Sequence, residues 1–559
     1  MSSAVLGARN LTGCEHRLAL DFTEHGDAAA SDTSPEARRR IEAAQGHRDH
    51  VITTLHGFQS DRTPSDVVTV EAGTHRERVE QTRRAVEAGA TWIFRAALPT
   101  DVERGRRGHA EALFRLGDGY LPIIVVNHRV TTLVNGERPA DAPPPTLRTS
   151  PLWGWHPAVD ATRSARSQRR DVMRLAHLTA MLDDLGWGTA DAGARVGGLI
   201  GLDADCMVAV SLDAALTEYA EEFEHRHAIA EGSVPTVARR VGECRSCHWW
   251  TRCESDLADR RDVSLVVGGS QATVLQEAGI TTFDALAAYR GDPPEDWPAA
   301  VPFADAIVSA ASWVDDIPLV RRLDRPRLRR ADIEVDVDME SYSERGAYMW
   351  GTLLTDNTDP SREVRYLPFV TWDPLPTLDE GRSFAEFWNW MAAERRAARE
   401  AGKTFAAYCY SQQAENRWLR GSADRFHGVV PGVPSRAEVD AFIGSKEWVD
   451  VFEAVGKNFV CPRGKGLKRI APVAGFNWRD AEASGEASME WYAAAVALDG
   501  AAFDESQRAR LLTYNEDDVQ ATKVLREWIS SQDVLELPTV REILTRRAAE
   551  GWVPTSRSV

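Results

Sequence analysis

The clearest alternation of hydrophobic and polar positions in the chain runs over residues 331–340, which read Ala-Asp-Ile-Glu-Val-Asp-Val-Asp-Met-Glu. The isoleucine, valines and methionine share one face of this segment, and the opposite face carries only acids. Because side chains alternate across a β-strand, the pattern predicts a strand with one apolar and one acidic face. Asp338 and Glu340 are then expected on the same side of one strand.

The segments downstream of this strand alternate between strand-like and helix-like patterns. Strand-like runs cover residues 348–354 and 364–372, a helical stretch covers about 384–402, and another apolar run covers 404–410. The order is therefore three strands, a helix, a further strand and then helices. Such an order is typical of an α/β domain, which we place at residues 326–535.

Two short helical segments precede that domain, at residues 273–278 and 283–288, with the run Gly-Ile-Thr-Thr at 279–282 between them. The arrangement resembles a helix-hairpin-helix, whose turn offers backbone N–H groups to a phosphate. An ordinary helical hairpin that packs two domains together is the alternative interpretation. We assign residues 261–325 to this small helical connector and to the arginine-rich linker that follows it.

The length of 559 residues is too great for a single hydrophobic core and predicts two to four domains. We place an N-terminal α/β domain at residues 1–260 and a C-terminal tail at 536–559, so the fold prediction is a multidomain α/β protein. No apolar run approaches the roughly 20 residues of a membrane span, and no leading hydrophobic segment predicts secretion. We therefore expect a cytoplasmic protein without a membrane partner.

The formal charge of −18 argues against a protein that coats nucleic acid nonspecifically, so phosphate contacts must come from local clusters of Lys and Arg. Residues 163–170 contain four arginines and residues 321–330 contain six. The second cluster could lead a nucleic-acid strand toward the acidic face that follows it, and a solvated linker is the equal alternative. The basic residues that we consider as nucleic-acid contacts, here and on a later loop, are Arg327, Arg329, Arg330, Lys465 and Lys468.

A second group of acids lies near the end of the chain, in the run Thr-Tyr-Asn-Glu-Asp-Asp-Val at 513–519. Tyr514 precedes Asp518 by four residues, so both are expected on one face of a predicted helix. Together with Asp338 and Glu340 they could hold two divalent ions about 4 Å apart, because Mg²⁺ and Mn²⁺ prefer carboxylate oxygens. A phenol with a pKa of about 10 would orient the attacking water rather than act as a strong base.

Either acidic motif by itself is also typical of a solvated surface. Their joint occurrence in this order favours a metal site, and it resembles the RNase H-like exonuclease fold, specifically the YprB-like branch of the DnaQ-type group with four acids and a tyrosine. In that resemblance Asp338 and Glu340 match the first acidic motif, and Tyr514 and Asp518 match the closing one. It implies two Mg²⁺ or Mn²⁺ ions and exonuclease activity with 3′ to 5′ polarity.

One acid of this group is not fixed by the two motifs. The stretch Tyr-Cys-Tyr-Ser-Gln-Gln-Ala-Glu at 408–415 stands where DnaQ-type relatives carry an Asp, and we choose Glu415, as looks usual in the YprB-like branch. Asp450, in Trp-Val-Asp-Val-Phe at 448–452, is the substitute candidate.

Three of the seven cysteines lie together as Cys244-Arg-Ser-Cys247-His-Trp-Trp-Thr-Arg-Cys253. Without a secretion segment a disulfide framework is not expected, and clustered thiols in a reducing compartment are typical of a metal site. A fourth ligand could come from Cys14, near the start of the chain. The remaining cysteines stand in apolar or loop contexts and are expected to be ordinary: Cys206, Cys409 and Cys461.

One distant cysteine and a C-terminal trio resemble the iron–sulfur RecB-like nucleases, including the CRISPR-associated and AddB-type members. The resemblance implies a restriction-endonuclease-like α/β fold for residues 1–260. It also implies that a 4Fe–4S cluster ties the two ends of this domain together. Zinc is the competing metal, with His248 or His16 as alternative ligands.

The nuclease motifs of the RecB-like family are degenerate in this chain. Where relatives carry Gly-x-x-Asp, the chain has Gly-His-Ala-Glu ending at Glu111, which is still an oxygen ligand. Where they carry acid-x-Lys at the end of a strand, it has Asn127-His128-Arg129 after the apolar run 122–126. Asparagine is a poor substitute for an anionic metal ligand, and arginine cannot supply the titratable amine of a lysine.

The helix motif Gln-x-x-x-Tyr of these relatives is also altered, because it reads Arg174-Leu-Ala-His177 here. His75 could be the remaining family histidine, although a lone histidine is more often structural. We therefore interpret the N-terminal domain as a degenerate nuclease that binds or orients DNA. Glu111 and His128 are the residues through which low activity could persist.

The sequence as a whole predicts a metal-dependent exonuclease that acts on DNA single strands or strand ends, in DNA repair, recombination or defence. No P-loop motif occurs in the chain, so a separately encoded helicase is a candidate partner. Two alternatives stay open. One is a noncatalytic DNA-binding scaffold in which both nuclease folds have decayed, and the other is an exonuclease that acts on RNA.

Overall fold

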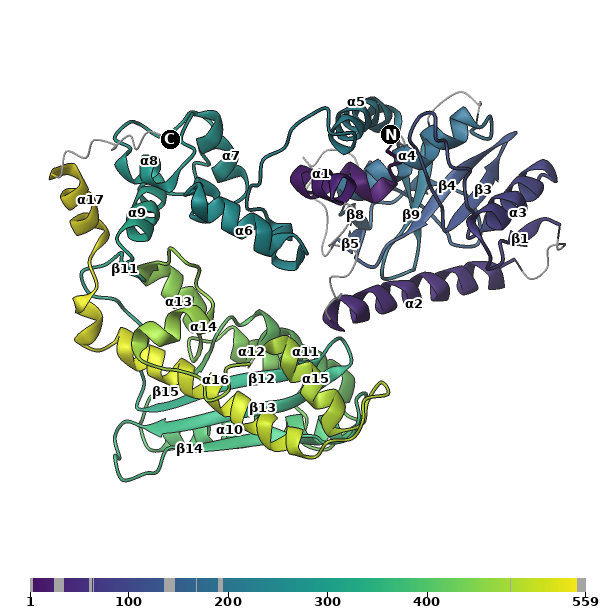
Figure 1. Ribbon diagram of the computed structural model, residues 1–559. Coiled ribbons are helices and arrows are strands. Elements are labelled where there is room, and N and C mark those ends of the chain that lie inside the picture. Colours follow the sequence, from purple (N-terminus) through teal and green to yellow (C-terminus); the bar gives the residue numbers. More distant parts are fainter. Residues whose placement is uncertain are drawn as a thin grey trace. The chain divides into compact units, whose positions relative to one another are not determined.

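The computed structural model describes residues 4–24, 35–59, 63, 65–134, 146–166, 168–189, 195–482 and 484–549, with the backbone alone for 35–40. The chain divides into two compact units, Met1–Leu257 and Ala258–Val559. Each unit is a mixed α/β structure built around its own large sheet (Figure 1). Within the described ranges, every helix is too short or too polar to cross a membrane.

The N-terminal unit is built on an eight-stranded sheet with the strand order β1-β2-β3-β4-β9-β10-β6-β7. β2, β3 and β4 form an antiparallel meander, and β9 joins β4 in parallel. Strands β5 (Thr131–Leu133) and β8 (Arg163–Ala165) pair separately. The bounds of the eight strands are β1 Val67–Thr69, β2 Trp92–Phe94, β3 Ala112–Leu116, β4 Gly119–Val125, β6 Arg148–Ser150, β7 Ala158–Val159, β9 Val196–Ile200 and β10 Met207–Ser211.

Hydrophobic cores lie on both faces of this sheet. The central strand β4 is buried along its whole length, which confirms the strand predicted from the apolar run at 122–126. Its Ile124 belongs to the core that α4 and α5 cover, whereas Ile123 belongs to a second core that α2 covers with Val51 and Leu55. The helices are η1 Ala8–Leu11, α1 Glu15–Thr23, α2 Pro35–Gly57, α3 His75–Glu87, α4 Arg169–Asp184, α5 Asp213–Ala230, η3 Gly242–Ser246 and α6 Trp250–Asp259.

The C-terminal unit is built on a five-stranded sheet with the order β14-β13-β12-β15-β16. β12, β13 and β14 form an antiparallel meander. β15 pairs with β12 in parallel, and β16 pairs with β15 in parallel. The strands predicted at 331–340, 348–354, 364–372 and 404–410 are all confirmed. Their bounds, with the short edge strand, are β12 Ile333–Tyr342, β13 Gly346–Asp356, β14 Arg365–Val370, β15 Phe405–Cys409 and β16 Trp448–Asp450.

The alternation along β12 separates two layers of this unit. Its apolar residues Val335 and Val337 pack in one core with Phe384 and Phe387 of α10. Its acids face the opposite layer, which α16 crosses (Figure 1). The helix predicted at about 384–402 is thereby confirmed as part of α10. The helices are α10 Asp379–Glu400, α11 Gln413–Phe426, α12 Arg436–Ile443, α13 Val451–Asn458, α14 Leu467–Ile470, η5 Ala471–Ala474, α15 Gly485–Ala495 and α16 Ser506–Ile529.

The connector helices and the C-terminal helix pack within the same unit as this sheet. Arg547 of α17 lies 2.5 Å from the carboxylate of Asp315, which follows α9, and Trp313 of α9 donates a hydrogen bond to the carbonyl of Pro462. β11 pairs with β17 beside them. The bounds are η4 Val263–Leu265, α7 Ser270–Glu277, α8 Phe283–Ala288, α9 Phe303–Val314, β11 Val320–Arg321, β17 Phe459–Val460, η6 Asp533–Glu536 and α17 Val540–Ala549.

The two short helices predicted in the connector are confirmed as α7 and α8. Gly279 between them has a φ of +78°, a conformation that favours glycine. The two helices and the turn between them are therefore present, while their helix-hairpin-helix character and the phosphate contact of the turn stay predictions. Residues 550–559 of the predicted tail lie outside the described residues.

Candidate active site

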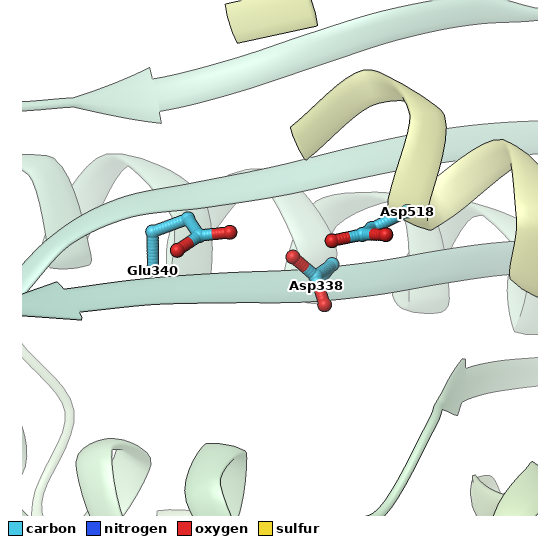
Figure 2. A group of neighbouring side chains, drawn as sticks. All are labelled: Asp338, Glu340 and Asp518. Carbon is cyan, nitrogen blue, oxygen red and sulfur yellow. The ribbon is translucent and has the colours of Figure 1, made fainter. Parts of the chain in front are cut away.

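Three carboxylates converge on the acidic face of β12. One oxygen of each of Asp338, Glu340 and Asp518 lies within 4.8 Å of the others. Two of these residues stand on one strand and the third stands on α16, which crosses it (Figure 2). Among the residues that the structure describes, no other group of three or more His, Cys, Asp or Glu side chains meets this spacing.

Glu415 joins this group as a fourth acid. It stands in the first turn of α11, is only 4% exposed, and is close enough to Asp338 and Glu340 for their charges to interact. Its Oε2 atom is buried and has no hydrogen-bond partner in the described part of the chain. A buried carboxylate oxygen without a donor is costly unless a cation reaches it.

Asp450 has a different environment. It caps the start of α13, and one of its oxygens accepts hydrogen bonds from the backbone N–H groups of Phe452 and Ser411, at 2.9 and 3.1 Å. Ser411 lies at a positive φ of +74°, so Asp450 fixes an unusual turn after β15. These contacts give Asp450 a structural role and leave Glu415 as the better-placed fourth acid.

The four clustered acids repel one another, and burial disfavours their charged forms. Burial is the largest cause of a raised pKa at each of them, and the neighbouring carboxylates add to it for Asp338, Glu340 and Glu415. The pKa rises to about 8 for Glu340 and Glu415 and to about 6 for Asp518, and it rises well above the usual range for Asp338. At neutral pH the raised pKa values favour the protonated forms of Asp338, Glu340 and Glu415, and bound cations would favour their charged forms.

Neutral donors hold individual oxygens of the cluster in place. Ser488 donates to Glu340 at 2.9 Å, Trp478 donates through its indole to Asp518 at 2.7 Å, and Asn515 donates to Asp338 at 2.7 Å. These donors were not predicted. Asn515 had a usable signal, because it lies inside the Tyr514–Asp518 motif, whereas Trp478 and Ser488 reach the site from segments without any local pattern.

The Trp478 donor is itself anchored to α16. Arg479, the next residue, pairs with Asp517 at 2.7 Å and with Glu516 at 2.8 Å. Its backbone N–H also donates to Asp517 at 2.9 Å. Two consecutive residues of the loop therefore bind three consecutive acids of the helix, and only Asp518 of these three faces the carboxylate cluster.

Tyr514 lies where the sequence predicted it, one helical turn before Asp518 on the same face of α16. It is 6% exposed, and its hydroxyl is hydrogen-bonded to Asp518. Burial and the nearby carboxylates raise the pKa of this phenol far above its usual range. Tyr514 therefore stays protonated and can orient a water molecule, but it cannot act as a strong base.

The two lysines predicted as nucleic-acid contacts differ in position. The ammonium of Lys468, at the start of α14, lies 4.9 Å from the centre of the Tyr514 ring and lowers the pKa values of Glu340 and Asp518 through its charge. The ammonium of Lys465 lies 3.8 Å from the centre of the Phe452 ring. Lys468 thus stands beside the carboxylate cluster.

The arginines of the 321–330 cluster also differ from one another. Arg330 forms a two-bonded ion pair with the buried Glu334, at 2.7 and 2.8 Å, so its guanidinium is occupied by a structural partner. This contact argues against the predicted nucleic-acid role of Arg330. The side chains of Arg327 and Arg329 are exposed and form no ion pair in the described part of the chain.

The cysteines predicted as metal ligands line one small pocket of the N-terminal unit: Cys14, Cys244, Cys247 and Cys253. His16, one of the alternative ligands, also lines this pocket, and its Nδ1 lies 2.9 Å from the hydroxyl of Thr236. His248 instead contacts Asp21 at 3.0 Å. Among the described residues no three of the four sulfurs lie within 4.8 Å of one another, whereas a tetrahedral zinc would hold them about 3.8 Å apart.

In the N-terminal unit, the acid of the predicted degenerate nuclease motif pairs with an arginine side chain of the same unit. Glu111 is 6% exposed, and its two oxygens accept hydrogen bonds from the guanidinium of Arg174 at 2.8 and 2.9 Å. One of these oxygens also accepts from the backbone N–H of Val125. A metal ion at this carboxylate would have to displace the arginine.

The other predicted residues of that motif set have partners of their own. His128 lies 2.9 Å from the buried Asp171, and Arg129 pairs with Asp203 at 3.2 Å. His75 starts α3 and contacts the hydroxyl of Thr100. Asn127 is exposed after the end of β4. Together with Arg166 and Gln168, however, His128 and Arg129 line an open basic pocket.

Comparison with known proteins gives one match. A family model described as the RNase H superfamily matches residues 424–530, which include Tyr514 and Asp518 but begin after the other three acids. The match covers well under half of the chain, and it supports an RNase H-like domain in the C-terminal unit. Neither the curated proteins nor the solved structures gave a significant match.

These findings confirm part of the sequence prediction. The chain is a multidomain α/β protein whose C-terminal unit carries an RNase H-like domain, and that domain suggests a nuclease. The match does not reach the N-terminal unit. The RecB-like resemblance and the iron–sulfur cluster therefore stay predictions.

Proposed function

We propose that the chain is a metal-dependent nuclease and that hydrolysis of the phosphodiester bond takes place at the carboxylate cluster of the C-terminal unit. The observation that carries this proposal is the convergence of Asp338, Glu340 and Asp518 within 4.8 Å inside an RNase H-like domain. None of these acids, nor Glu415, forms an ion pair with a basic side chain in the described residues. The orphaned oxygen of Glu415 fits a bound cation.

The residues of the site would divide the work as follows. Asp338, Glu340, Glu415 and Asp518 would hold two Mg²⁺ or Mn²⁺ ions, which when bound supply an activated water and charge stabilisation at the leaving oxygen. Tyr514 orients that water through its protonated hydroxyl. Lys468, at the edge of the cluster, places a backbone phosphate of the substrate over the acids.

The substrate and direction of cleavage are finer parts of the proposal. We take DNA single strands or strand ends as the substrate and 3′ to 5′ as the polarity, which the YprB-like resemblance implies. An RNA exonuclease would use the same residues. A noncatalytic scaffold is less favoured, because four buried acids without an internal cation are costly to keep unless they bind ions. Roles in DNA repair, recombination or defence, alongside a separate helicase, follow from the resemblance alone.

The test uses end-labelled single and double strands of DNA and RNA with Mg²⁺ or Mn²⁺. We expect stepwise shortening from the 3′ end by the full-length protein and none by Asp338→Asn, which removes one ligand charge. Glu111→Gln is the matched control in the other unit and should retain activity. The reverse result would place the chemistry in the N-terminal unit. Full activity in both variants would overturn a role for either acid.

We propose further that the four-cysteine pocket of the N-terminal unit holds a 4Fe–4S cluster. One observation supports it: the four cysteines line a single pocket. Such a cluster would tie Cys14, near the start of the unit, to the three cysteines at its end. Protein purified without oxygen should absorb near 400 nm and lose this band in Cys14→Ser. A colourless protein that contains zinc would overturn the assignment.

The degenerate N-terminal site is proposed to bind nucleic acid without cleaving it. The ion pair of Glu111 with Arg174 leaves no room for a metal at that acid, while Arg129 and Arg166 line the basic pocket beside it. Binding can be measured with the Asp338→Asn protein, so that the strand stays intact. Replacing Arg129 and Arg166 by Ala should weaken binding and reduce its salt dependence. Unchanged binding would remove this role.

A further inference from the structure

Asn515 is buried at the centre of the carboxylate cluster. It stands on α16 between Tyr514 and Asp518 and is fully inaccessible to solvent. Its Nδ2 donates to Oδ2 of Asp338 at 2.7 Å. The hydroxyl of Tyr366, on β14, donates to its Oδ1 at 2.8 Å. Because an ionised carboxylate only accepts hydrogen bonds, the NH₂ end faces Asp338, and Oδ1 is left to accept from the Tyr366 hydroxyl.

The room for this amide comes from a glycine on the neighbouring strand. Gly351 of β13 is the direct partner of Asp338 in the register of the two strands. A Cβ atom at Gly351 would lie 1.6 Å from Oδ1 of Asn515 and 3.1 Å from a ring carbon of Tyr366. Any side chain here would therefore expel the amide from its place, since real Cβ contacts do not come below about 3 Å.

We propose that Asn515 is a positioning residue that fixes the carboxylate of Asp338 for metal binding, and that Gly351 is the position that admits it. The inference rests on the proposed function and adds a residue outside the metal-ligand set. With one oxygen of Asp338 held by the amide, rotation of the carboxylate is restricted and the second oxygen is left for an ion. The amide contributes this order without a charge, so it neither competes with a cation nor adds to the repulsion among the acids.

An acid at position 515 would act in the opposite way. Asp has nearly the shape of Asn but presents a second acceptor to Oδ2 of Asp338, where a donor is required. The contact would then be repulsive unless a proton is shared between the two groups. Asn515→Asp should therefore disturb the site more than Asn515→Ala, which only removes the donor.

The test measures Mn²⁺ binding to the full-length protein by calorimetry, without any substrate. We expect Asn515→Ala to weaken Mn²⁺ binding by roughly 10- to 100-fold, the range found when a partner of a metal ligand is removed. Tyr366→Phe should act in the same direction with a smaller effect, because the amide keeps its place but can flip. In activity assays the Mn²⁺ concentration for half-maximal rate should rise accordingly. Equal Mn²⁺ affinity in Asn515→Ala and the parent protein would overturn the inference.

Two controls separate this inference from the proposed function. If the parent protein and Asp338→Asn both fail to bind Mn²⁺, the proposed metal site fails. If the parent protein binds Mn²⁺ and Asn515→Ala binds it equally well, only the positioning role fails. In both cases thermal unfolding in EDTA checks that the variants are folded.

Gly351→Ala supplies a second, independent measurement. We expect it to lower the unfolding temperature of the metal-free protein and to weaken Mn²⁺ binding, because the new methyl group displaces Asn515. In an Asn515→Ala background the same substitution should lower the unfolding temperature much less, since its main clash is gone. An equal loss in both backgrounds would show that Gly351 is required for a reason other than Asn515.

Discussion

Buried carboxylates are treated in opposite ways in two regions of the strand β12. Glu334 and Asp336, in its first half, are fully buried and bound by Arg526 of α16, with distances of 2.7 and 2.8 Å to Asp336. Asp338 and Glu340, two and four residues further on, receive only neutral donors. The same helix crosses both pairs. Helix α16 thus places an arginine, Arg526, beside Glu334 and Asp336. Beside Asp338, which is proposed to bind metal, the same helix places the neutral Asn515.

The N-terminal unit repeats the first arrangement. Its buried Glu111 is balanced by Arg174, so this acid resembles the Glu334 end of β12 rather than the Asp338 end. An arginine within reach of a buried acid replaces an external ion with an internal one. The buried acids of the two units thus differ in one physical variable, the presence of a guanidinium beside them.

The largest expected effect comes from removing the structural cation. Arg526→Met should destabilise the C-terminal unit by about 3–5 kcal/mol, because it leaves Asp336 buried without a counter-ion and leaves Glu334 with Arg330 alone. Denaturant unfolding measures this loss. Adding Glu334→Gln and Asp336→Asn to the same variant should recover part of it, because the unpaired charges are then gone. A loss below about 1 kcal/mol for Arg526→Met would contradict the distinction between the two pairs.

Adding a metal ion should stabilise the protein through Asp338 and Glu340 and not through Glu334 and Asp336. Mn²⁺ at a hundred times its dissociation constant should stabilise the parent protein by about 2.7 kcal/mol, since the ion binds the folded state alone. Asp338→Asn should lose most of this gain, while its stability in EDTA should equal or exceed that of the parent, because a neutral amide replaces a buried carboxyl whose charged form is disfavoured. Glu111→Gln should keep the gain. An unchanged Mn²⁺ effect in Asp338→Asn would place the ion elsewhere.

The two units should respond to pH in opposite directions. Burial lowers the pKa of His177, in the N-terminal unit, to about 4. The unfolded chain therefore binds more protons than the folded one between about pH 6.5 and 4, and stability is lost as the pH falls through this window. Burial raises the pKa values of Glu340 and Glu415 to about 8. Here the folded chain binds more protons, so stability is lost as the pH rises from about 4.5 to 8.

Hydrogen exchange resolved by segment, in EDTA and corrected for the intrinsic exchange rate, can follow both units in one sample. His177→Gln should remove the loss at acid pH from the N-terminal unit. Saturating Mn²⁺ should remove the loss at alkaline pH from the C-terminal unit, because the ions replace the protons. Slopes of the same sign in the two units would contradict the assignment of the pKa shifts.

The smallest effect concerns the single lysine beside the metal-binding acids. Lys468→Ala should raise the KM for a strand about 5- to 10-fold, or about 1 kcal/mol, with little change in kcat if it only holds a phosphate. Lys465→Ala is a closely matched control, three residues away and against Phe452, and should change KM less than twofold. Equal effects of the two substitutions on KM would contradict a specific role of Lys468 in binding a phosphate of the substrate.

Patterns within a short stretch of sequence predicted much of the C-terminal fold. The alternation along β12, the helix α10 and the shared face of Tyr514 and Asp518 all depend on local periodicity, and the structure has each of them. The choice between Glu415 and Asp450 could not be made locally, because both are acids after apolar strands. It depends on the fold, in which Asp450 accepts backbone hydrogen bonds as the cap of α13, whereas Glu415 keeps one buried oxygen without a partner in the described residues.

The contacts that basic and amide side chains make with the buried acids could not be predicted from the sequence. Arg526 lies 190 residues from Asp336, and Asn515 lies 177 residues from Asp338. Nothing near Arg526 in the sequence signals its partner, and the motif around Asn515 places it near the site without showing that it contacts Asp338. Arg330 was expected to face nucleic acid because it stands in an arginine-rich run, but its pairing with Glu334 depends on how the chain enters the sheet. The number of charged residues in a segment does not show which of them form ion pairs within the folded protein.

The separation of the acids along the chain also sets the timing of the site during synthesis. Glu340 leaves the ribosome about 180 residues before Asp518 does. At roughly 5–20 residues per second this delay lasts on the order of 10 to 35 s. During that interval the growing polypeptide carries at most three of the four clustered acids. Under the proposed function, a chain made in this order cannot hydrolyse a strand at this site before Asp518 has been synthesised.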